Sequence, residues 1–108
     1  MPQRRVRYGE WLPSIERSLE LACKTACIEL KESKKTVTKK DYEKKTLDNL
    51  KMLIDAEKSR HGSEDEREEL EGAFVYFMKT WGKEDREPYR RLIDESFEKC
   101  KNELKSNL

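Results

Sequence analysis

The sequence has few residues that bend or break regular secondary structure. Its 108 residues include only three prolines and four glycines, so little of the chain is available for tight turns. β-Branched residues are also few, whereas lysine and glutamate, which favour helices, are abundant. The composition therefore predicts an all-α protein, and a chain of this length is expected to form a single domain with one modest core.

Long apolar segments are absent as well. Hydrophobic residues make up 34% of the chain and charged residues 44%, and no stretch approaches the ~20 apolar residues of a spanning helix. The opening segment, MPQRRVRYGEWLP, is basic but lacks the apolar region of a secretory signal. We therefore expect no membrane contact and an intracellular location, either cytoplasmic or nuclear.

Cysteine and histidine are too few to support most metal sites. The odd number of cysteines (Cys23, Cys27 and Cys100) and the lack of a secretory signal predict reduced thiols. With His61 they would supply a Cys₃His set for zinc. However, Cys23 and Cys27 lie one turn apart within a helix, whereas structural zinc sites use a closely spaced pair on a turn. We expect no metal and no cofactor.

Enzymatic chemistry has little support in the sequence. One histidine cannot supply the two Glu-x-x-His units of a di-metal bundle. The glycines lie far apart, which excludes a phosphate-binding loop. No local signature surrounds any cysteine as a nucleophile. We therefore expect a protein without catalytic activity.

Helix-start signals divide the chain into four helices. Pro13 suits a first-turn position. Thr38 and Ser63 are each followed three residues later by an acidic residue, as in a capping box. Short connections favour antiparallel neighbours, so we predict an up-and-down antiparallel four-helix bundle-like domain with a short basic N-terminal arm. The expected bounds are 1–12 for the arm and about 13–34, 38–60, 64–81 and 85–106 for the helices.

Several large apolar residues fall outside the stripes expected to form the core. Leu21 and Ile28, seven residues apart, share the back of the first helix, and Val75 and Tyr76 flank the core face of the third. A central helix of a bundle can be apolar over more than half its circumference, so the last two residues also fit a plain core. The alternative is a contact surface for a second copy, giving a homodimer, or for a protein partner.

A lysine stripe follows the second helix. Its members fall within about 40° of one another on a helical projection, and a basic arm precedes the first helix. Such a stripe can follow a phosphate backbone. However, each of Lys44, Lys51 and Lys58 follows an aspartate three residues earlier, so the stripe can also be a solvated, self-paired face. The candidate nucleic-acid contacts are Lys40, Lys44, Lys51 and Lys58 with Arg4, Arg5 and Arg7 of the arm.

Two segments loosely resemble a known helical hairpin. The Leu-Pro pair that opens the first helix and LDNLKMLIDAEKSR in the second are similar to nodavirus RNA-silencing suppressors, with Leu47-Asp48-Asn49-Leu50 as the centre of the match. The resemblance covers a minor part of the chain. It implies a small dimeric protein that binds double-stranded RNA.

The sequence as a whole favours a non-catalytic helical interaction module that self-associates and docks a macromolecular partner. The residues expected at that contact are Leu21, Ile28, Val75 and Tyr76. The alternative hypothesis is a nucleic-acid-binding module, for double-stranded RNA in particular, that uses the lysine stripe and the arginine arm.

Overall fold

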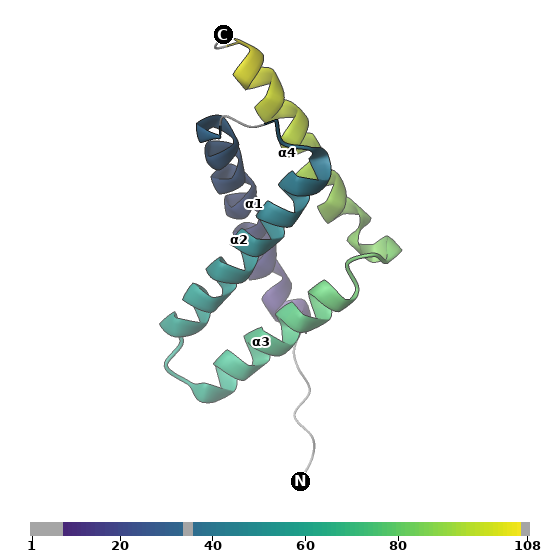
Figure 1. The fold of residues 1–108 in the computed structure, drawn as a ribbon. Coiled ribbons are helices and arrows are strands. Elements are labelled where there is room, and N and C mark those ends of the chain that lie inside the picture. The colour runs from purple at the N-terminus through teal and green to yellow at the C-terminus, as the bar shows by residue number, and fades with distance from the viewer. Residues whose placement is uncertain (1–7, 34–35, 107–108) are drawn as a thin grey trace.

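The computed structural model describes residues 8–33 and 36–106. All regular secondary structure in these residues is helical, which confirms the predicted all-α, four-helix architecture (Figure 1). The elements are α1 (Tyr8–Glu32), α2 (Lys39–Arg60), α3 (Glu64–Lys79), a short 3₁₀ helix η1 (Glu84–Arg86) and α4 (Glu87–Ser106).

The helices are arranged around the α1–α2 hairpin. α1 and α2 share the most extensive contact, and α3 and α4 each pack against both of them. α3 lies near the turn that joins it to α2, whereas α4 extends to the opposite end of the molecule (Figure 1). In the described part of the chain the backbones of α3 and α4 do not approach each other, and the two helices meet through the rings of Phe77 and Tyr89, whose centroids lie 5.2 Å apart. Each therefore covers a different half of the hairpin.

One hydrophobic core runs through this arrangement and draws on all four helices. The predicted stripes supply it, because residues three and four apart share a face of a helix. The side chains with no exposed surface include Ile15 and Leu19 of α1, Leu50 and Ile54 of α2, Leu70 and Phe77 of α3, and Ile93 of α4.

The starts of α2 and α3 are fixed by the predicted caps. The hydroxyl of Thr38 accepts a hydrogen bond from the backbone N–H of Asp41 (3.1 Å), and that of Ser63 accepts one from Glu66 (3.4 Å). Each bond satisfies a backbone donor that has no partner within the helix. These caps explain why α2 and α3 begin where the sequence predicted.

The first helix begins at Tyr8, before the expected start at Pro13, so residues 8–12 are helical instead of forming part of the arm. A tertiary contact accounts for the extension. The indole N–H of Trp11 donates to Glu69 (3.3 Å), and its ring meets His61 edge-on with centroids 5.2 Å apart. Burial of this aromatic ring favours continuing the helix past Pro13. Residues 1–7 of the predicted arm lie outside the described residues.

The fourth helix begins at Glu87 and follows the short 3₁₀ turn instead of starting at the predicted residue 85. The turn is held by Arg86, which is only 5% exposed. Its guanidinium lies 5.0 Å from the ring centre of Phe77, and its Nε donates to the Thr80 hydroxyl (3.1 Å). The connection thus packs against the end of α3, beside the ring contact of Phe77 in α3 with Tyr89 in α4.

A buried tyrosine joins three of the helices. The hydroxyl of Tyr42 in α2 donates to the backbone carbonyl of Cys23 in α1 (2.9 Å) and lies 2.8 Å from the hydroxyl of Ser96 in α4. Burial raises the pKa of the Tyr42 phenol, against a smaller opposing effect of the hydrogen bond with Ser96. The phenol is therefore neutral near pH 7 and remains a donor.

Replacing Tyr42 with Phe removes the shared hydroxyl and leaves the ring in place. We expect the free energy of unfolding to fall by roughly 1–2 kcal/mol, because the buried hydrogen bonds of the Tyr42 hydroxyl to the Cys23 carbonyl and to Ser96 are lost. Urea denaturation followed by circular dichroism measures the change. Tyr76→Phe, on a half-exposed ring, is the matched control and should cost under about 0.5 kcal/mol. Equal effects of the two variants would contradict the joining role of Tyr42.

Candidate functional site

The four predicted contact residues are all exposed. Leu21 is 50% exposed, Ile28 57%, Val75 51% and Tyr76 51%. None of them belongs to the core, so the plain core interpretation of Val75 and Tyr76 is wrong.

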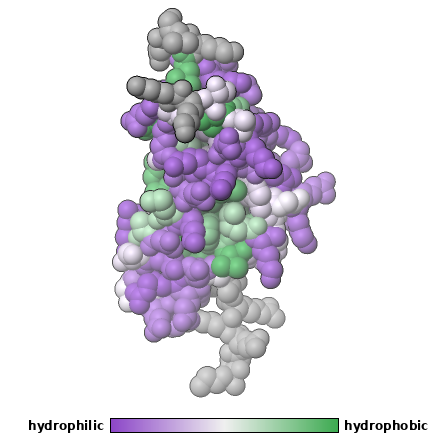
Figure 2. Space-filling view, viewed as in Figure 1, coloured by the Kyte–Doolittle hydropathy of each residue, from purple (hydrophilic) through white to green (hydrophobic). Residues whose placement is uncertain are grey.

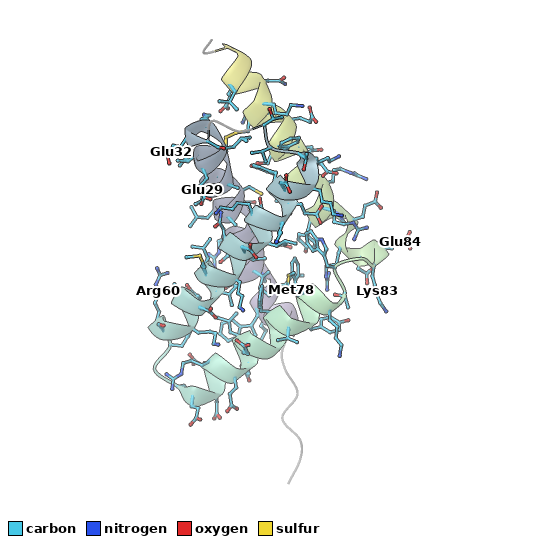
Figure 3. All side chains as sticks on the ribbon, in the orientation of Figure 1. Glu29, Glu32, Arg60, Met78, Lys83 and Glu84 are labelled. Carbon is cyan, nitrogen blue, oxygen red and sulfur yellow. A yellow bond between two sulfur atoms is a disulfide. The ribbon has the colours of Figure 1, made fainter. Side chains whose placement is uncertain are left out.

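On the face drawn in Figure 2 hydrophilic side chains predominate, and hydrophobic ones gather near the middle, between α2 and α3. Figure 3 shows Met78 between these two helices.

Leu21 and Ile28 lie on the outer side of α1. Their neighbours along the helix on the opposite side, Leu19, Ala22 and Ala26, are fully or almost fully buried. Seven residues correspond to nearly two turns, so Leu21 and Ile28 stack on one face about 10.5 Å apart along the axis. Two large apolar side chains thus form a short stripe on the surface of α1.

Charged residues extend this stripe at both ends. Arg17 lies before Leu21, and Glu32 lies after Ile28; both are exposed. The guanidinium of Arg17 makes a long hydrogen bond to the Ser14 hydroxyl (3.4 Å). Neither Arg17 nor Glu32 forms an ion pair with any residue that the structure describes. Neither residue was predicted as a contact, although the helical spacing of both from Leu21 and Ile28 is visible in the sequence.

A groove of about 490 Å³ runs between α1 and α4, beside Ile28. Its walls combine apolar side chains, Leu92 among them, with lysines and glutamates of both helices. An ion pair between Lys31 and Glu103 (2.9 Å) joins the two helices at this groove. The hydrogen bond and the charge of Lys31 lower the pKa of the Glu103 carboxyl. This groove could not be predicted from the sequence, because it depends on the packing of α4 against α1.

Two cysteines at this groove form a disulfide. Cys27 of α1 and Cys100 of α4 are bonded, with Cα atoms 5.8 Å apart and a sequence separation of 73. The prediction of three reduced thiols is therefore wrong for these two residues. The reason is spatial: packing of α4 on α1 brings together cysteines that are distant in the sequence. Disulfides persist in oxidising compartments, which argues against the reducing location that the cysteine count predicted.

Cys23 is the remaining thiol, and it is free and buried. Burial raises its pKa to about 11, although a hydrogen bond with Ser96 acts in the opposite direction. A thiol with this pKa is almost entirely protonated near neutral pH, whereas the thiolate is the reactive form. Cys23 therefore packs as a small hydrophobic side chain.

The Cys₃His set considered for zinc is not assembled. Cys27 and Cys100 lack free thiolates, and His61 lies at the end of α2, where its Nδ1 is 2.8 Å from Glu66. Across residues 8–33 and 36–106 there is no group of three or more histidine, cysteine, aspartate or glutamate side chains that could hold a metal ion.

None of the helices described is long and apolar enough to cross a membrane.

The lysine stripe lies on α2 and is only partly paired. Lys58 contacts Glu71 of α3 (2.5 Å) and, more distantly, Asp55 (3.9 Å). Lys40, Lys44 and Lys51 are exposed and have no carboxylate within ion-pair distance among the described residues. The expected pairs with the preceding aspartates thus form only at Lys58. Arg4, Arg5 and Arg7 of the candidate nucleic-acid surface lie outside the described residues.

The exposed residues of α3 form a second, separate feature. Val75 and Tyr76 are adjacent in the sequence and project about 100° apart around the helix. The ring of Tyr76 lies 5.9 Å from the guanidinium of Arg86, which places it beside the α3–α4 connection. The structure therefore divides the predicted contact set into two parts, one on α1 and one on α3.

The number of reactive thiols tests the disulfide assignment. We expect no thiol to react in the native protein, because Cys23 is 4% exposed. One thiol should react after unfolding without reductant and three after unfolding with reductant, measured with a thiol-specific reagent and mass spectrometry. Three reactive thiols in the unreduced, unfolded protein would contradict the Cys27–Cys100 bond.

No protein-family model, curated protein or solved structure matches this chain.

Proposed function

We propose that the protein is a non-catalytic helical interaction module that self-associates and docks a macromolecular partner. The observation that carries this proposal is the pair Leu21 and Ile28, each about half exposed on the outer side of α1. Large apolar residues gathered on one surface favour a contact with another molecule. Val75 and Tyr76 on α3 supply a second contact surface, for a protein partner.

The size of this apolar pair sets the expected strength of self-association. Burying a half-exposed leucine or isoleucine contributes about 1–1.5 kcal/mol, so two from each copy contribute roughly 4–6 kcal/mol. A complex with a Kd of 1 µM requires about 8 kcal/mol. The apolar contact alone is therefore too small, and the charged residues around it must contribute. We expect a weak homodimer, populated at tens to hundreds of micromolar.

Replacing Ile28 with Asp should give a folded monomer, because the contact would then bury an unpaired carboxylate. Sedimentation equilibrium measures the mass, and circular dichroism checks the fold. Met52→Asp is the matched control, since Met52 of α2 is 70% exposed and lies outside the proposed contact; this variant should dimerise like the unaltered protein. A dimer that survives Ile28→Asp would refute the assignment of the α1 surface.

A second candidate function is nucleic-acid binding through the lysine stripe, with double-stranded RNA as the form suggested by the sequence resemblance. The supporting observation is that Lys40, Lys44 and Lys51 are exposed and have no ion pair with any described residue. Lysines without a protein partner can each replace a condensed counterion on a phosphate backbone. The acidic residues on the same helix oppose this function, so we rank it second.

Replacing both Lys44 and Lys51 with Gln tests this second function. If both contact phosphates, the slope of log K against log salt should become shallower by about 1.5–2. Fluorescence anisotropy with labelled double-stranded RNA, double-stranded DNA and single strands measures the binding. Lys45→Gln is the control, because Lys45 is paired with Glu29 (2.8 Å). Absence of binding by the unaltered protein at physiological salt would exclude this function.

The Cys27–Cys100 disulfide bears on where the protein acts. A disulfide between two packed helices is stable in an oxidising environment and is reduced in the cytosol. We therefore favour an oxidising location for the form that contains the Cys27–Cys100 disulfide. The proposed contact through α1 does not require the disulfide, because Leu21 and Ile28 lie on α1 itself.

A further inference from the structure

Four exposed residues of α1 form one stripe with a regular spacing. Arg17, Leu21, Ile28 and Glu32 fall within an arc of about 60° at 100° per residue, on the side of the helix opposite the core. In this order the stripe reads basic, apolar, apolar, acidic. Figure 3 shows Glu32 at the end of α1, directed away from the other helices.

The stripe is symmetric about its own centre. The midpoint between Leu21 and Ile28 falls between Lys24 and Thr25, and the midpoint between Arg17 and Glu32 falls at the same place. When a second copy of α1 lies antiparallel with its centre on this point, Leu21 meets Ile28 of the partner subunit. In the same register Arg17 meets Glu32 of the partner subunit, and both contacts occur twice.

The charges favour this orientation over the parallel one. Parallel helices in register would place Arg17 against Arg17 of the partner subunit, and the two Glu32 carboxylates against each other. The antiparallel register converts these repulsions into two attractive pairs. Both side chains are available for such pairs, because neither forms an ion pair within the described part of the chain. The two attractive pairs also add to the free energy that the apolar contact contributes.

The centre of the contact can accommodate its polar residues. Thr25 is half-buried, and its hydroxyl donates to the Leu21 carbonyl (3.0 Å), so it brings no unsatisfied donor to the contact. Lys24 lies on the flank of the stripe, where its long apolar stem can cover the contact while its ammonium stays in water.

We propose that two copies of this protein form a two-fold symmetric dimer through antiparallel α1 helices, centred between Lys24 and Thr25. Leu21 and Ile28 form its apolar centre, and Arg17 and Glu32 form its two ion pairs. This inference rests on the self-association proposed above and specifies its partner, orientation and register. Because the same surface patch serves both copies, the assembly closes at two subunits.

Charge reversal tests the register. We expect Arg17→Glu and Glu32→Arg each to raise the dimer Kd roughly tenfold at low salt, because each exchanges two attractive contacts for two repulsive ones. The double variant, Arg17→Glu with Glu32→Arg, should restore the Kd of the unaltered protein, since it re-forms both pairs with reversed sign. All differences should shrink at 1 M salt, where surface charges are screened. Sedimentation velocity over a concentration series measures each Kd.

Arg91→Glu is the matched control, because Arg91 is an exposed arginine of α4 whose partner, Glu87, belongs to the same helix (2.9 Å). Its Kd should equal that of the unaltered protein. Circular dichroism confirms that every variant is folded, which the exposed positions of Arg17 and Glu32 favour.

The outcomes separate this inference from the proposed function. An unaltered protein that is monomeric at hundreds of micromolar would refute both. A dimer that is lost in Ile28→Asp but unchanged by either charge reversal would refute the antiparallel register and leave self-association through α1 standing. Single variants that weaken the dimer without rescue by the double variant would also refute the register. Weakening followed by rescue supports it.

Discussion

The hydroxyl of Tyr42 is the interaction on which the arrangement of helices most depends. It belongs to α2, donates a hydrogen bond to a backbone carbonyl of α1 and shares a second hydrogen bond with Ser96 of α4. Tyr42 as a whole is only 1% exposed. A buried hydroxyl left without partners costs about 1–3 kcal/mol. The three helices are therefore held in the one arrangement that satisfies it, whereas apolar packing alone tolerates small shifts.

α3 is attached to the same hairpin at its two ends, by different contacts. Near its start, Glu69 accepts a hydrogen bond from Trp11 of α1, and just after its end the Trp81 indole donates to Glu43 of α2 (3.1 Å). Because α3 and α4 occupy separate halves of the hairpin, its inner side is covered along its length. The outer side of α1 has no such cover in the described chain, which is why two large apolar residues remain on the surface there.

Features that depend on neighbouring residues could be predicted from the sequence, and features that depend on distant ones could not. The caps at Thr38 and Ser63 and the buried stripes are local, and the exposure of Leu21 and Ile28 follows from the same helical period. The early start of α1 depends on Trp11 and Glu69, which are 58 positions apart. The pairing of Cys27 with Cys100 likewise requires α4 to pack on α1. The ion pair of Lys58 with Glu71 also requires α3 to pack beside α2, which local sequence does not determine.

The Cys27–Cys100 bond makes the larger part of the molecule a covalently closed ring. The ring spans 73 positions and includes all of α2 and α3. In the chain-entropy view, closing a loop of this length stabilises the folded state by about 4 kcal/mol. A single backbone cut anywhere inside the ring would leave both pieces joined through the sulfur atoms. The protein can therefore survive one proteolytic nick in any of its connections between helices without losing a fragment.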